Sequence, residues 1–96
     1  MAEFRLQFHY DPLKAAANLR KHGVSFEEAV TTFFDRNAIS NFDADHSSGS
    51  DMRFVNIGLS TMGHLLFVVH NEDGSTIRII SARLATAAEK TTYEEA

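Results

Sequence analysis

The spacing of apolar residues constrains the fold of this chain more than any other feature, because it changes twice along the sequence. Residues 4–10 alternate apolar and polar side chains, which is typical of a half-buried strand. Apolar residues then recur at helical spacing up to Phe34, and short apolar runs return between Phe54 and Ala82. With a last helix near the C-terminus, the expected order is β-α-α-β-β-β-α. This order predicts an α+β fold with a mainly antiparallel four-stranded sheet and its helices on one face.

Capping patterns set the expected helix boundaries. An N-cap followed by proline begins the first helix, glycine ends it, and two capping boxes begin the second and third helices. The residues are Asp11-Pro12, Gly23, Ser25 with Glu28, and Thr86 with Glu89. Residues 35–51 are polar and predict an exposed loop, with a short strand possible at 38–42. A hairpin loop is expected at 71–75, with Asp73-Gly74 supplying the positive φ angles.

Composition limits the classes of protein to which the chain can belong. Its 96 residues predict one domain, residues 1–96. The absence of cysteine excludes disulfides and thiolate metal sites. There is no apolar run of membrane-spanning length and no secretory signal, so we expect a cytoplasmic protein. The formal charge of −4 counts against phosphate binding over the whole surface but permits a local basic cleft.

Three arginines on predicted strands are the most informative candidates for chemistry. Guanidinium groups at Arg53, Arg78 and Arg83 either bind phosphate bidentately or pair with carboxylates. The carboxylates considered for such pairing are Asp43, Asp45 and Glu89. No common catalytic motif is present. A metal site made of His46, Asp43 and Asp45 is the alternative to a solvated loop, and we favour the loop and no metal.

Short motifs in a fixed order resemble the BrnT toxin family. The first lie at Asp11-Pro12-x-Lys14-Ala15-x-x-Asn18 and Lys21-His22-Gly23-Val24-Ser25-Phe26-Glu27-Glu28-Ala29. Next come Asp43-x-x-His46, Arg53, Ile57-Gly58 and Gly63-x-Leu65-Leu66. The last are Arg78-Ile79-Ile80-Ser81-Ala82-Arg83-x-Ala85-Thr86, Glu89 and Tyr93. Each piece alone is a weak signal, but together they span nearly the whole chain, so the resemblance is specific.

The resemblance implies both a fold and a function. It implies a RelE-like fold and a metal-independent ribonuclease toxin of a type II toxin–antitoxin system, which cuts RNA, blocks translation and needs no cofactor. It also implies a partner, a BrnA-type antitoxin with a ribbon-helix-helix DNA-binding domain, so that DNA is contacted only through the antitoxin. An apolar groove for that partner is expected from Phe26, Val30 and Phe34, unless these residues all belong to the core.

Metal-independent RNA cleavage needs a base for the 2′-hydroxyl, a cation for the phosphorane and an acid for the leaving oxygen. In the expected catalytic site, Arg78 and Arg83 hold phosphate and Arg53 supports them. Proton transfer is assigned to His64 or His46. Lys21 and His22 are expected to contact the RNA backbone, or else to compensate the dipole at a helix C-terminus.

Two positions depart from the family pattern and keep other functions open. Members often carry arginine where this chain has Leu59 and His64, and they tend to be more basic. These differences favour an alternative in which the chain is a catalytically weak or inactive binding module that keeps antitoxin binding and operon autoregulation. A different small-molecule enzyme that uses the histidines is a third possibility.

Overall fold

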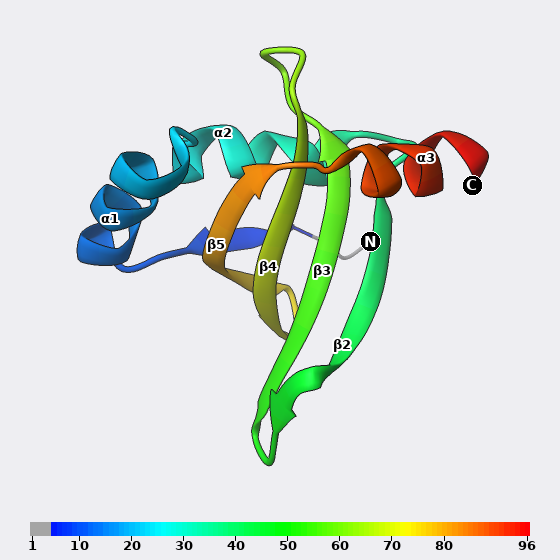
Figure 1. The fold of residues 1–96 in the computed structure, drawn as a ribbon. Coiled ribbons are helices and arrows are strands. Elements are labelled where there is room, and N and C mark those ends of the chain that lie inside the picture. Colours follow the sequence, from blue (N-terminus) through cyan, green and yellow to red (C-terminus); the bar gives the residue numbers. More distant parts are fainter. Residues whose placement is uncertain (1–4) are drawn as a thin grey trace.

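The computed structural model describes residues 5–96, which form three α-helices and a five-stranded sheet (Figure 1). In chain order the elements are β1 (Gln7–His9), α1 (Pro12–His22), α2 (Phe26–Thr31), the 3-10 turn η1 (Thr32–Phe34), β2 (Ile39–Ser48), β3 (Asp51–Leu59), β4 (Leu65–Asp73), β5 (Thr76–Leu84) and α3 (Ala87–Glu95). No helix within residues 5–96 is long and apolar enough to cross a membrane.

The sheet is mixed and has the order β1-β5-β4-β3-β2. Strands β2 to β5 are antiparallel to their neighbours, as expected, whereas β1 runs parallel to β5. β1 has three residues because it meets β5 only from Thr76 to Arg78. The expected strand at residues 4–10 is therefore too long, and its first residue, Phe4, lies outside the described residues.

The prediction of four strands was wrong because residues 39–48 form a strand of their own. β2 lies at the edge of the sheet and most of its residues are exposed, so its sequence has no apolar alternation. Hydrogen bonding to β3, from Ile39 opposite Ile57 to Asp43 opposite Arg53, makes it a strand despite its polar composition. Edge strands commonly carry charged side chains, which discourage pairing with other chains.

Helices α1 and α2 pack against β5 on one side of the sheet, while α3 crosses the other side (Figure 1). The core lies under α2, where Phe26 and Ala29 meet Leu66, Val68 and Ile79. The expectation that all helices share one face is therefore correct only for α1 and α2. The helix α3 has no buried residue and is held by side-chain contacts to the opposite face.

Asn18 of α1 takes the place of a strand at the exposed edge of β5. β1 ends opposite Arg78, which leaves the rest of that edge without a strand partner. The Asn18 amide donates to the Ala82 carbonyl at 2.8 Å, and its carbonyl oxygen accepts from the Ala82 N–H at 3.1 Å. The same amide donates to the Val24 carbonyl at 2.9 Å. This buried side chain therefore fixes α1 and the turn after it against β5.

His70 is a buried titratable group in the middle of the sheet. It is fully buried on β4 between Phe33 and Phe54, with ring centroids 4.9 and 5.9 Å away. Neither ring nitrogen has a hydrogen-bond partner within residues 5–96, and the Glu72 carboxylate is 3.6 Å from Nδ1. Burial lowers the pKa of His70 to about 4, so the ring is neutral at pH 7.

We predict that this histidine makes the fold sensitive to acid. Between pH 6.5 and about 4 the unfolded chain binds a proton at residue 70 that the folded chain rejects. The contribution of His70 to the unfolding free energy is therefore fully present above pH 6.5. It is lost as the pH drops, by about 3 kcal/mol in all. Urea unfolding at pH 7.5, 6, 5 and 4.5 measures this loss. The His70→Phe variant should lose less stability over the same range, and an identical loss in both proteins would contradict the prediction.

Candidate functional site

Five side chains form a row across the face of the sheet opposite α2. The strand register places Asp43 opposite Arg53, Arg53 opposite Asn71, Asn71 opposite Arg78, and Arg78 opposite His9. Directly paired residues lie on the same face of a sheet. Along β4 the even-numbered residues Leu66 and Val68 face the helices, so the odd-numbered Asn71 lies on the other face. The row therefore lies on the face of the sheet away from α2, which we call the open face. It is at the end of β3 and β4 that is far from the turn connecting them.

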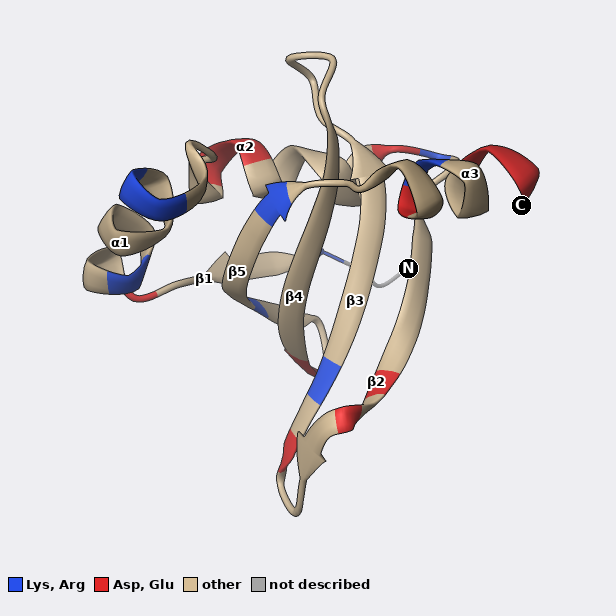
Figure 2. Ribbon diagram, viewed as in Figure 1, with Lys and Arg blue, Asp and Glu red and all other residues tan. Residues whose placement is uncertain are grey.

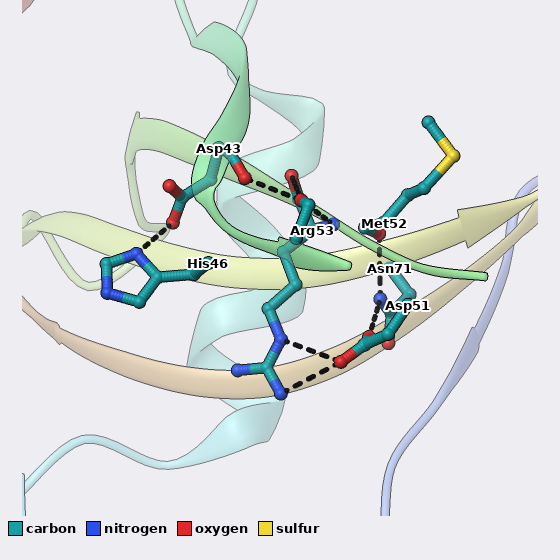
Figure 3. A network of polar contacts seen from close by, with 7 residues as sticks. Asp43, His46, Asp51, Met52, Arg53 and Asn71 are labelled. Atoms are coloured by element: carbon teal, nitrogen blue, oxygen red, sulfur yellow. Dashed lines mark hydrogen bonds and ion pairs between the residues drawn. The ribbon is translucent and has the colours of Figure 1, made fainter. Parts of the chain in front are cut away.

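Asp51 organises the middle of this row (Figure 3). The Arg53 Nε and Nη2 atoms each lie 3.3 Å from the Asp51 Oδ2. The Asn71 amide donates to the Asp51 Oδ1 at 3.1 Å and to the Met52 carbonyl at 2.8 Å. Hydrogen bonds from Asn71 and Arg53 lower the pKa of Asp51, and the positive charges of Arg53 and Lys14 lower it further. Arg53 therefore points along β3 toward Asp51, with its guanidinium already bound to that carboxylate.

His46 lies at the β2 end of the row. Its Nδ1 is 2.9 Å from the Asp43 Oδ2, and most of its side chain is exposed (Figure 3). The possible metal site of His46, Asp43 and Asp45 is not assembled. No group of three or more potential ligands in residues 5–96 is arranged to hold a metal ion. The structure thus brings His46 to Arg53, but as a partner of one aspartate.

Arg78 differs from the other two arginines because its guanidinium is available. No carboxylate within residues 5–96 lies at ion-pair distance from it. Its exposed side chain lines a depression of about 320 Å³ together with His9, Asn71 and Thr76, and the hairpin residues Glu72 and Asp73 complete the wall. An unpaired guanidinium beside an imidazole and an amide can bind an anion and transfer a proton.

Arg83 is bound to the C-terminal helix instead. Its Nη1 and Nη2 atoms lie 2.8 and 2.9 Å from the two carboxylate oxygens of Glu89, and the guanidinium stacks 4.0 Å above the Phe67 ring. The hydrogen bonds with Glu89 raise the pKa of Arg83, and the same contacts lower the pKa of Glu89. The ion pair with Glu89, which the sequence offered as the alternative to phosphate binding, is thus the observed state.

His64 lies at the other end of the sheet, in the turn between β3 and β4. It is seven residues before Asn71 along the chain, which corresponds to about 20 Å along a strand. Its Nδ1 is 2.8 Å from the Glu28 Oε2, which also accepts from the Ser60 hydroxyl at 2.6 Å. Glu28 is therefore not the reciprocal half of a capping box with Ser25, although the Ser25 hydroxyl does accept from the Glu28 N–H.

Lys21 and His22 lie in the last turn of α1, beside β5. Together with Lys14, Asn18 and Ser81 they line a second depression, of about 210 Å³. Figure 2 shows positive segments on α1, on β5 and on β3, and negative segments on α2, on α3, on β2 and at the end of the β2–β3 hairpin. The negative total charge is thus unevenly distributed over the fold.

The sequence analysis assigned no role to His9 or Asn71, although a signal for Asn71 existed. The β4–β5 hairpin turns on Gly74 and Ser75, with Asp73 opposite Thr76. A positive φ is found only at Gly74, not also at Asp73, among the hairpin residues. A two-residue loop at Gly74 and Ser75 would have predicted that Asn71 pairs with Arg78, because residues equally distant from the loop lie opposite each other. His9 had no comparable signal, because a parallel partner strand cannot be identified by counting.

Comparisons with known proteins identify the family and the fold of the chain. The family model for the ribonuclease toxin BrnT of type II toxin–antitoxin systems matches residues 10–89. The crystal structure of the BrnT ribonuclease toxin from Brucella abortus is similar, with a TM-score of 0.55 and 22% sequence identity. The alignment covers 84% of this chain and 97% of the Brucella chain. No curated protein matches the sequence.

We predict that Arg78 and Arg83 differ in their contribution to stability. Arg83→Ala removes a bidentate ion pair and a ring contact, so it should lower the unfolding free energy by about 1 kcal/mol, since partial exposure weakens both contacts. Arg78→Ala removes no observed ion pair and should change stability by less than about 0.5 kcal/mol. Thermal unfolding of the two variants checks this, and equal losses would show that Arg78 has a structural partner.

Proposed function

We propose that this chain, which belongs to the BrnT family of ribonuclease toxins of type II toxin–antitoxin systems, is itself an active, metal-independent endoribonuclease. The observation that carries the proposal is the row on the open face, where Arg78, which has no carboxylate partner within residues 5–96, stands between Asn71 and His9. The guanidinium supplies positive charge for a phosphate, and the imidazole can accept a proton. These are two of the three requirements for cutting RNA through its own 2′-hydroxyl.

In the proposed reaction Arg78 binds the scissile phosphate from the depression, and His9 takes the proton of the neighbouring 2′-hydroxyl. The 2′-oxygen then attacks phosphorus and the bond to the 5′-oxygen breaks. The 5′-oxygen receives a proton from the His9 imidazolium or from water, so the products are a 2′,3′-cyclic phosphate and a 5′-hydroxyl. A placed charge donor is worth about 10²–10³ in rate, and a positioned proton acceptor about 10²–10⁴.

The width of the row decides whether proton transfer is assigned to His9 or to His46. Neighbouring strands are about 4.8 Å apart, so the four steps from β2 to β1 span about 19 Å between the backbones of Asp43 and His9. A single phosphodiester cannot reach both ends. His9 is one strand from Arg78, whereas His46 lies near Arg53, which already has a carboxylate partner. We therefore assign proton transfer to His9 and a supporting position along the RNA to Arg53 and His46.

The other residues expected from the sequence take different roles in this proposal. Arg83 and His64 are each bound to a glutamate away from Arg78, so their role is to hold α3 and the β3–β4 turn in place. Lys21 and His22 remain RNA-backbone contacts from α1. An inactive binding module is the second candidate. The pairing of Arg53 and Arg83 with carboxylates favours it, because it leaves Arg78 as the available guanidinium among the three arginines.

We predict that Arg78→Ala and His9→Ala each lower RNA cleavage by about 100-fold while the protein stays folded. The measurement is the initial rate on a defined single-stranded RNA in the presence of EDTA, with circular dichroism to check folding. Arg36→Ala, which removes an exposed arginine outside the row, is the matched control and should retain the parental rate. Activity that is absent from the parent protein under these conditions would support the inactive binding module.

The family also implies an antitoxin, and we propose a BrnA-type protein with a ribbon-helix-helix domain as the partner. Of the three residues expected to form its groove, Phe26 is buried in the core and Val30 is partly buried, whereas Phe34 is 67% exposed. Large apolar side chains with this exposure are common at protein interfaces. The apolar part of the antitoxin surface is therefore centred on Phe34 in this proposal.

We predict that co-expression with the product of the neighbouring gene gives a complex of about one to one that no longer cleaves RNA. Phe34→Ser should lower the amount of complex recovered by affinity purification, because it removes an exposed aromatic anchor. Leu13→Ser is the control, since Leu13 is 80% exposed on α1 at a distant part of the chain. Equal recovery of all three proteins would remove Phe34 from the interface, and no recovery at all would argue against the proposed partner.

A further inference from the structure

A second depression lies farther along β5 than the proposed cleavage site, between that strand and α1. A ridge on α1 faces the edge of β5 at Ser81. It is formed by residues on successive turns of the helix, Lys14, Asn18 and Lys21. The space between them is about 210 Å³. Residues three or four apart in a helix share one face, so the two lysines line this depression together. The buried Asn18 between them holds the helix to Ala82 and fixes the width of the gap.

The charges around this depression are available to a ligand. Within residues 5–96 no carboxylate lies at ion-pair distance from Lys14 or Lys21. The negative end of the α1 dipole lies near Lys21 and His22, but Lys14 is in the first turn, where a cation is unfavourable. Compensation of the helix dipole therefore does not account for Lys14. A polyanion bound along the ridge accounts for both lysines.

Two observations place the depression near the cleavage site. The positive charge of Lys14 acts on Asp51, which binds Arg53 and Asn71 in the row. On β5, Ser81 follows Arg78 by three residues, or about 10 Å along the strand. The register of β4 and β5 shifts between Val69 and His70, which leaves Ile80 without a paired residue beside the depression. Arg78 and Ser81, which faces the lysine ridge, are therefore separated by about 10 Å along β5.

We propose that the depression between α1 and β5 binds a second backbone phosphate of single-stranded RNA, with Lys14 and Lys21 as its ligands. The inference rests on the proposed function and specifies its substrate. Two phosphate sites about 10 Å apart require a strand of several nucleotides, so a dinucleotide fills only the site at Arg78. A single strand fits this path because it can bend to present successive phosphates, and because attack by the 2′-oxygen needs a backbone free of duplex geometry.

The test compares the salt dependence of RNA binding in matched variants. The ligand is a decanucleotide with 2′-O-methyl groups, which cannot be cleaved, and binding is followed by fluorescence anisotropy between 50 and 300 mM KCl. The double variant Lys14→Ala/Lys21→Ala should bind about tenfold more weakly at the lowest salt concentration. Its slope of log K against log salt should be shallower by about 0.7, the value for one phosphate of a single strand. The control Arg20→Ala/Lys90→Ala removes two positive charges outside the depression and should keep the parental slope.

The outcomes separate the inference from the proposed function. Cleavage of the unmodified decanucleotide by the parent protein is measured in parallel. If the parent cleaves RNA but both double variants show the same slope, the second phosphate site is wrong and the proposed function stands. If the parent binds and cleaves nothing, both fall. A matching loss of affinity for a ten-base-pair RNA duplex would overturn the assignment to single-stranded RNA.

Discussion

The antiparallel pairing of β4 with β3 and β5 is the constraint on which the rest of the structure depends. It sets Asn71 between Arg53 and Arg78, and it places Leu66 and Val68 on the side of α2. Because side chains alternate along a strand, a slip of one residue would turn the arginines toward the core. The buried apolar face therefore selects the register, and the position of the polar row follows from it.

Two side chains then determine how the helices meet this sheet. Asn18 satisfies the backbone of Ala82 where β1 has ended, so α1 stays beside β5 without a further strand. Gly58 permits the close approach of η1 to β3, since a Cβ at this position would lie 2.8 Å from the Thr32 carbonyl oxygen. Both contacts replace ordinary packing by a specific fit, and Asn18 keeps the lysines of α1 beside the edge of β5.

The distribution of charge reconciles an acidic chain with a proposed RNA site. Among the three strand arginines, Arg53 and Arg83 are bound to carboxylates, whereas no carboxylate within residues 5–96 lies at ion-pair distance from Arg78. The ion pairs position side chains at a modest energetic gain, as is usual for partly exposed pairs. The local positive charges that an approaching phosphate would meet are Arg78 and the lysines of α1, and the carboxylates of Glu72 and Asp73 line the same depression as Arg78.

Local patterns in the sequence were sufficient for most of the elements. The cap at Asp11, the glycine at 23 and the capping box from Thr86 to Glu89 predicted helix ends that the structure confirms, because each depends on neighbouring residues alone. The α+β class and the antiparallel order of the later strands followed from the apolar spacing. The motifs that resemble BrnT also predicted the family correctly.

Only the tertiary structure decided which of the candidate residues act together. Hydrogen bonds to β3 make β2 a strand from residue 39 to residue 48, well beyond the short strand that the sequence allowed at 38–42. His64 and Arg83 are bound to Glu28 and Glu89, which are 36 and 6 residues distant in the chain, and neither lies beside Arg78. His9 reached Arg78 through a parallel pairing between the first and last strands. Such contacts depend on strand order and on competition among charged partners, and neither is encoded in local spacing.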